Sequence, residues 1–282
     1  MIRAFQIAVL ACLPFCLTGC GGPEEKEPIW KQLKIGDLAP SHSGKGPDGQ
    51  LLKTINFNVY IFEIPAENIS ALDDVWQMLY PKPLRYNNYD AFKANSFLVG
   101  FGQAQMWSKI IDLLLAADGK GTKRVSLLLP DGRANDLPIA RLDKEQTISY
   151  ISSGGSMERA TVGPGMVALR LKAVKIPGSK GVCQVSILPV FSPPTRGPIP
   201  ELVYRAKAGE FPFTSVGFGL KMGPGDLVVL GPEKYIDHQI SLGSLFFSRP
   251  EGSLFFSRTE RKPPERKPAV RIFLLLCTGI ND

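Results

Sequence analysis

The sequence predicts an α+β protein in which a small α/β module precedes a mainly antiparallel, sandwich-like β domain. Two observations lead to this class. In residues 54–142, helical patterns lie between short strand-like runs. After residue 143 helical periodicity disappears, and β-rich runs alternate with turns that contain Gly and Pro. The 28 Gly and 24 Pro of the chain fit a turn-rich fold.

The expected α/β module occupies residues 54–142. Its first strand starts at Thr54, where apolar and polar residues alternate, and Pro65 ends it. Ser70 and Asp73 resemble a capping box, which predicts a helix after this strand. Two helices are therefore expected to cover one sheet. The elements of this strand–helix–strand–helix–strand unit are expected at 54–64, 70–80, 96–101, 102–118 and 124–129.

The expected β domain occupies residues 143–282. Residues 167–176 and 182–190, joined by a turn with Pro and Gly, are predicted to form a hairpin. The strand-like runs of this domain are 147–151, 165–176, 181–191, 213–222, 227–230 and 270–278.

The first residues have the pattern of an export signal. Arg3 gives a short charged start, an apolar run extends to residue 17, and small residues precede Cys20. The run is too short for a membrane-spanning helix, which needs roughly 20 residues. We therefore assign residues 1–19 to a signal peptide, and residues 20–53 to a polar tether with an irregular lead-in.

The segment Leu17-Thr18-Gly19-Cys20 resembles the lipobox of bacterial lipoproteins. The resemblance implies cleavage between Gly19 and Cys20 and acylation at Cys20, so that several acyl chains hold the protein on a membrane of the cell envelope. The residue after Cys20 is not Asp, which resembles sorting to the outer membrane, facing the periplasm, in bacteria with two membranes. An ordinary signal peptide with a chance cysteine is the alternative.

The formal net charge is +7, and it falls to +6 when Arg3 leaves with the signal. Much of the positive charge lies in residues 258–267, among prolines and acidic residues. A solvated Pro-rich basic loop at 249–269 is therefore expected. No segment matches a nucleic-acid-binding fingerprint, and no nucleic-acid partner is expected.

Of the five cysteines, Cys183 and Cys277 remain in the folded part after processing and lipidation. A disulfide between them and two isolated buried thiols both agree with the sequence. Two cysteines without nearby histidines do not predict a metal site, and no cofactor is expected.

The sequence offers no catalytic constellation. The two histidines are His42, in a Ser- and Gly-rich lead-in, and His238, which follows Asp237. Adjacency in sequence does not place a carboxylate and a nucleophile on opposite imidazole nitrogens, as a triad requires. No Gly-x-Ser-x-Gly elbow and no Walker-type phosphate loop is present. We therefore predict no catalytic residue.

A nine-residue segment is duplicated in tandem, at 243–251 and 252–260, and each copy contains Gly-Ser-Leu-Phe-Phe-Ser-Arg. Two copies of such a short unit do not form a repeat array. One interpretation is a local duplication that extends a loop. The other is an aromatic and basic patch that contacts lipid headgroups or a partner.

Three stretches of the β-rich half occur in a recognisable order: the hairpin at 165–191, the segment Gly223–Gly231, and Leu242–Phe246 followed by a strand at 271–278. Together they resemble the C-terminal domain of bacterial secretins, the outer-membrane channels of type II and III secretion and of type IV pili. The resemblance implies protein–protein assembly, as a homo-oligomer or with other envelope proteins. Because this half is shorter than a full channel subunit, a scaffold is expected rather than a pore.

The leading hypothesis is therefore a lipid-anchored, non-enzymatic envelope protein that acts as scaffold or accessory in a secretion- or pilus-type assembly. The alternative is an envelope hydrolase or ligand-binding lipoprotein acting on cell-wall polymer or a small molecule. That alternative requires a pocket with converging polar groups.

Overall fold

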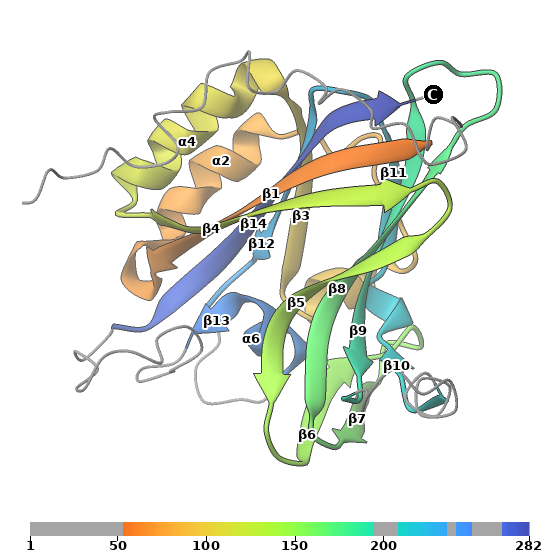
Figure 1. The fold of residues 1–282 in the computed structure, drawn as a ribbon. Coiled ribbons are helices and arrows are strands. Elements are labelled where there is room, and N and C mark those ends of the chain that lie inside the picture. The colour runs from red at the N-terminus through yellow and green to blue at the C-terminus, as the bar shows by residue number, and fades with distance from the viewer. Residues whose placement is uncertain (1–52, 195–207, 236–240, 250–266, 282) are drawn as a thin grey trace, which may run out of the picture. The chain divides into compact units, whose positions relative to one another are not determined.

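The computed structural model describes residues 53–194, 208–235, 241–249 and 267–281. Among these residues strands predominate, every pair of named strands is antiparallel, and a few helices accompany them, as in an α+β protein. The described strands form two six-stranded sheets and one two-stranded ribbon (Figure 1). No helix among these residues is long and apolar enough to cross a membrane.

Sheet 1 is built from both halves of the chain. Its order is β3 (Phe97–Gln103), β12 (Asp226–Pro232), β14 (Ala269–Asn281), β1 (Thr54–Pro65) and β4 (Lys120–Pro130), with the short β13 (Ser248–Arg249) also paired to β14. The central strand β14 has an uninterrupted apolar run over residues 272–277, which suits burial on both faces. Its buried Arg271 lies opposite Glu63 of β1, with 3.4 Å between nitrogen and carboxylate oxygen.

The boundary expected after Leu142 does not separate two sheets. Strands β12 and β14, from the second half of the chain, lie between β3 and β1, and β5 (Ala134–Leu142) belongs to the other sheet. The physical reason is that β1 is buried on both faces and pairs on both edges, so β4 and β14 flank it. Strand periodicity indicates which residues form strands, but not which distant strand becomes the neighbour.

Helices cover the outer face of sheet 1 (Figure 1). The predicted capping box is wrong: a 3₁₀ helix, η4 (Ala66–Leu72), precedes α2 (Asp73–Met78), and no side chain caps either helix. The packing is close, because a Cβ at Gly100 of β3 would lie 2.5 Å from the Leu79 Cβ. The second predicted helix is present as η5 (Ala104–Met106) and α4 (Trp107–Ala116).

Sheet 2 contains the predicted hairpin, which is confirmed. Strand β8 (Gly165–Lys175) pairs with β9 (Cys183–Ser192) along their whole length. The order of the sheet is β2 (Arg85–Tyr86), β11 (Phe218–Met222), β9, β8 and β5, with β10 (Phe211–Pro212) paired to β9.

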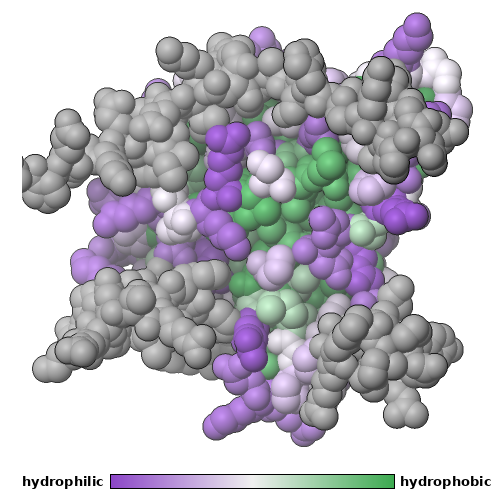
Figure 2. All heavy atoms as spheres, viewed as in Figure 1, coloured by the Kyte–Doolittle hydropathy of each residue, from purple (hydrophilic) through white to green (hydrophobic). Residues whose placement is uncertain are grey.

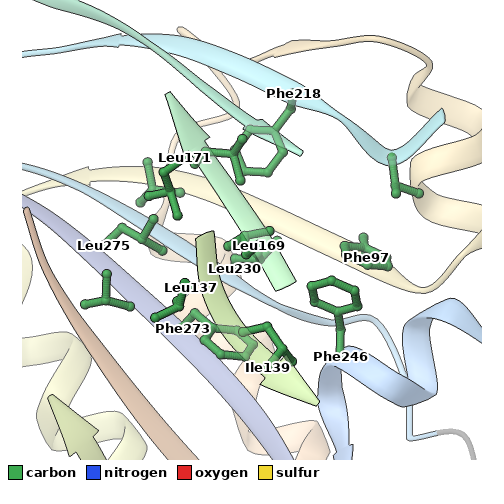
Figure 3. Close-up of a cluster of buried hydrophobic side chains, with 14 of the residues drawn as sticks. Phe97, Leu137, Ile139, Leu169, Leu171, Phe218, Leu230, Phe246, Phe273 and Leu275 are labelled. Carbon is green, nitrogen blue, oxygen red and sulfur yellow. The ribbon is translucent and has the colours of Figure 1, made fainter. Parts of the chain in front are cut away.

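The main core lies between the two sheets. Figure 3 shows side chains of β5 and β8 from one sheet facing those of β12 and β14 from the other. Phe246 of α6 (Leu242–Phe247) and Phe97 of β3 close one end of this core, with ring centroids 5.4 Å apart. The remaining elements, at the same end, are α3 (Tyr89–Ala94), the ribbon of β6 (Gln146–Ile151) and β7 (Met157–Val162), and η6 (Thr214–Val216).

Candidate functional site

The two cysteines of the folded part meet between the sheets. Cys183 begins β9 and Cys277 lies on β14, and both side chains are fully buried. The Cys183 thiol donates a hydrogen bond to the Met222 carbonyl oxygen (3.4 Å), and the Cys277 thiol is hydrogen-bonded to Cys183. This sulfur–sulfur hydrogen bond and burial raise the pKa of Cys277. Both thiols are free in this structure, so the disulfide stays a prediction.

Several predicted residues lie outside the described part of the chain. They are Gly19 and Cys20, His42 and His238, and most of the basic loop expected at 249–269. The signal peptide, the lipidation of Cys20 and the tether therefore stay predictions.

The first copy of the duplicated segment is a core element. Phe246 and Phe247 are 0% and 1% exposed, and the Phe247 ring lies 4.7 Å from that of Phe97. A Cβ at Gly243 would come within 2.3 Å of the Asn95 carbonyl oxygen, so α6 can dock there only with glycine. The interpretation of this copy as an exposed aromatic patch is therefore wrong. The second copy lies outside the described residues.

A pocket of about 380 Å³, here called the hydroxyl pocket, lies where the β6–β7 turn meets β10 and η6. Tyr150 donates a hydrogen bond to Glu158 (2.7 Å), and the hydroxyls of Ser152 and Ser156 lie 3.0 Å apart. Hydrogen bonds from Ser152, Tyr150 and Ser156 hold the pKa of Glu158 below its ordinary value. Burial and the bond to Glu158 raise the pKa of Tyr150 to about 12. Near neutral pH, Glu158 is therefore an exposed carboxylate that accepts hydrogen bonds from neighbouring hydroxyl groups.

Side chains from other elements hold the turn that carries these serines. Asn95 donates from Nδ2 to the Ile151 carbonyl oxygen (2.9 Å) and accepts at Oδ1 from the Ile151 N–H (2.8 Å). The Ser215 hydroxyl donates to the same carbonyl oxygen (2.8 Å), and Asn88 donates to the Ser153 carbonyl oxygen (2.9 Å). Asn95 and Ser215 are themselves buried. The hydroxyl pocket is thus pre-organised by supporting hydrogen bonds.

An aromatic wall borders the hydroxyl pocket. The rings of Tyr150 and Phe211 both pack edge-on against the fully buried Phe213, with centroids 5.4 and 5.0 Å from it. Tyr150 and Phe211 are half-buried and line the pocket. Rings held in this way offer an apolar surface at low entropic cost.

A second groove, of about 570 Å³, runs along β5, β8 and the end of β9. At its border Arg170 binds Asp136 with two hydrogen bonds of 2.7 Å, and Glu210 with two of 2.9 and 3.0 Å. These hydrogen bonds, to Asp136 first and then to Glu210, raise the pKa of Arg170. Because the three charges are engaged with one another, we interpret the cluster as a cross-link between β5, β8 and the segment before β10.

Strand β4 forms one edge of sheet 1, and no other described strand pairs with its outer side. Its first half carries exposed charges, Lys120, Lys123 and Arg124, which protect an edge from pairing. Its second half, Val125–Leu129, has none, and Leu128 is 60% exposed. Figure 2, in the view of Figure 1, shows hydrophobic side chains in the middle of the visible face of the molecule, with hydrophilic side chains around them. We call Val125–Leu129 the open edge.

Comparisons with known proteins identify no family. No protein-family model matches the chain, and no curated protein does. Among solved structures, the chain matches the InvG secretin domain β-barrel of the Salmonella SPI-1 injectisome NC-base at 12% identity with a TM-score of 0.25. The match covers 83% of this chain and 65% of the InvG chain, less than two thirds of it. A TM-score of this size carries no argument about fold or function.

Proposed function

We propose that this chain is a lipid-anchored, non-enzymatic envelope protein that acts as a scaffold or accessory in a secretion- or pilus-type assembly. The lipobox-like Leu17–Cys20 segment supports the anchor. The order of the three secretin-like stretches supports the kind of assembly. Of these stretches, the first forms the β8–β9 hairpin, the second ends in β12, and the third forms α6 ahead of β14.

The observation that carries the assembly proposal is the open edge. An unpaired, uncharged strand edge is a template for another strand, because its backbone N–H and C=O groups can continue the sheet. Strand β5, which forms one of the two edges of sheet 2, is a poorer template for another strand. Pro138 and a register irregularity between Pro138 and Ala140 interrupt it. Strand pairing is therefore favoured at β4 and disfavoured at β5.

The partner we propose for the open edge is a second copy of this chain. In an antiparallel two-fold pairing centred on Leu127, Val125 of each copy lies opposite Leu129 of the other, so the inward-facing apolar residues match. The two copies would share one continuous sheet.

A Leu128→Lys variant tests this pairing. It places a charge on the open edge at a side chain that is 60% exposed, so the fold of the single chain is expected to persist. We expect wild type extracted in mild detergent to be a dimer by light scattering. The dissociation constant of the variant dimer should be at least about tenfold higher than that of wild type, which corresponds to a loss of roughly 1.4 kcal/mol of dimerisation free energy.

Met157→Lys is the matched control, because Met157 is 68% exposed on the β6–β7 ribbon, away from the open edge. It should leave the dimer unchanged. A monomeric wild type, or equal dissociation in both variants, would contradict pairing at β4.

A Cys20→Ser variant tests the anchor separately. Because several acyl chains on Cys20 are expected to hold the protein on the membrane, the variant should appear in the soluble fraction of lysed cells and lose acyl incorporation. The matched control is Cys277→Ser, which should stay acylated and membrane-bound. A Cys20→Ser chain that remains acylated in the membrane would exclude the lipid anchor.

A further inference from the structure

We infer that the hydroxyl pocket binds a neutral saccharide. The sugar hydroxyls would form hydrogen bonds with Glu158, Ser152 and Ser156, and one face of the sugar ring would pack on Tyr150 and Phe211. This binding activity goes beyond the assembly proposed above, and none of the pocket residues belongs to the open edge. The volume, about 380 Å³, lies in the range of ligand pockets, roughly 300–1,000 Å³.

The polar groups of the pocket match a saccharide. A serine hydroxyl both donates and accepts hydrogen bonds, and an ionised carboxylate accepts up to about four. The hydroxyls of Ser152, Ser156 and Tyr150 converge on the Glu158 carboxylate, whose oxygens keep further acceptor capacity for hydroxyl donors. Sugars present donors and acceptors at the same spacing around one ring, so they can join this network without leaving a group unpaired.

The apolar part of the pocket fits the same class of ligand. One face of a pyranose ring carries C–H groups, and aromatic rings are the protein surface that such a face contacts. Tyr150 and Phe211 line the pocket with their centroids 5.9 Å apart, and the buried Phe213 packs against both rings. The pocket therefore combines a hydrogen-bonding side with a rigid aromatic side.

The charge of the pocket excludes an anionic ligand. Glu158 is the one charged residue among the described residues that line it, so an anionic sugar would be repelled. A metal ion is a poorer fit, because the described part of the chain holds no group of three or more His, Cys, Asp or Glu that could bind one. Ca²⁺ usually takes several carboxylate and carbonyl oxygens.

The support of the turn distinguishes a binding site from a simple connection. A hairpin turn can form from its own residues alone. In this turn Gly155, with φ at +78°, adopts the left-handed conformation that a tight turn requires. Here Asn95 and Ser215 are buried polar side chains from other elements, and both bond Ile151 at the base of the turn. This support fixes the hydroxyl groups before any ligand arrives, which lowers the entropic cost of binding.

Saturation-transfer NMR on the full chain in detergent, with chitotriose and maltotriose as probes, tests the inference. We expect binding with millimolar or tighter affinity, weakened about tenfold by Glu158→Gln and by Phe211→Ala. Glu145→Gln is the matched control: it makes the same change at an exposed position just before β6, outside the pocket, and should bind like wild type. Circular dichroism verifies that each variant is folded.

Binding of both trisaccharides supports a general saccharide site, and binding of chitotriose alone narrows the site to N-acetylamino sugars such as those of cell-wall polymer. Absence of binding by either, or equal binding in Glu158→Gln and wild type, overturns the inference. The Leu128→Lys variant should bind the probe as wild type does. Loss of assembly and loss of saccharide binding are therefore separable results.

Discussion

We expect removal of either copy of the duplicated segment to leave the protein folded, and removal of both copies to unfold it. Deleting 252–260 keeps α6 as it is, and deleting 243–251 joins Leu242 to an identical Gly-Ser-Leu-Phe-Phe-Ser-Arg. The two products differ at one residue, Pro250 in the first and Thr259 in the second. Either deletion only shortens the connection from β13 to β14. Halving the length of a loop changes the free energy of unfolding by about 0.6 kcal/mol.

The large effect comes from the aromatic residues of the copy that packs in the core. In the chain without 252–260, Phe246→Ala removes a fully buried ring and leaves a cavity between the sheets, at a cost of about 3–5 kcal/mol in the free energy of unfolding. Urea denaturation followed by circular dichroism measures both effects. Tyr89→Ala, a truncation of a 53% exposed aromatic residue, is the control and should cost far less. If the single deletions were as destabilising as Phe246→Ala, the second copy would have a structural role of its own.

The second large effect is expected at the cysteine pair. A disulfide between Cys183 and Cys277 would tie β9 of sheet 2 to β14 of sheet 1 and close a loop of roughly 94 residues, from 183 to 277. By loop entropy such a cross-link stabilises the folded state by about 4–5 kcal/mol. In forming this bond, the two thiols together lose two protons and two electrons. A disulfide-bearing oxidant of the export compartment would accept them and be reduced to two thiols.

Mass spectrometry under denaturing, non-reducing conditions checks this prediction. Protein isolated from the envelope should be two mass units lighter than its reduced form, and reductant should lower its stability by the amount given above. A variant with Cys183→Ala and Cys277→Ala should not respond to reductant. Two titratable thiols in freshly exported protein, with no stability change on reduction, would contradict the disulfide. Because the pKa of Cys277 is raised and both thiols are buried, we expect the bond to form before folding is complete.

Local patterns predict much of this fold. The alternation from Thr54, the turn between β8 and β9, and the apolar run before Cys277 each specify a strand from neighbouring residues alone. What the patterns do not contain is the partner of each strand. Strand β14 pairs with β1 across more than two hundred residues, and this pairing joins the two expected domains into one sheet.

The candidate sites show the same limit. The run of Ser and Gly at 152–156 predicts a polar turn, but its supports, Asn95 and Ser215, lie more than fifty residues away in sequence. The contact between Cys183 and Cys277 likewise depends on how the sheets stack. From the sequence, Phe246 and Phe247 agree equally with an exposed patch and with a core, because a six-residue segment is too short to show a hydrophobic period. The close packing of Gly243 against Asn95, which buries the segment, is visible only in the structure.

The most direct test of the assembly uses mixed chains. Both chains carry Cys183→Ala and Cys277→Ala, and then one carries Ser126→Cys and the other Leu128→Cys. In a two-fold pairing centred on Leu127, residue 126 of one copy lies opposite residue 128 of the other, at a Cβ separation of about 4.5–5.5 Å. We predict that mild oxidation of the mixture gives a disulfide-linked pair of unlike chains, with little cross-linking in either chain alone. Absence of the mixed product, or equal cross-linking in each chain alone, would contradict strand pairing at the open edge.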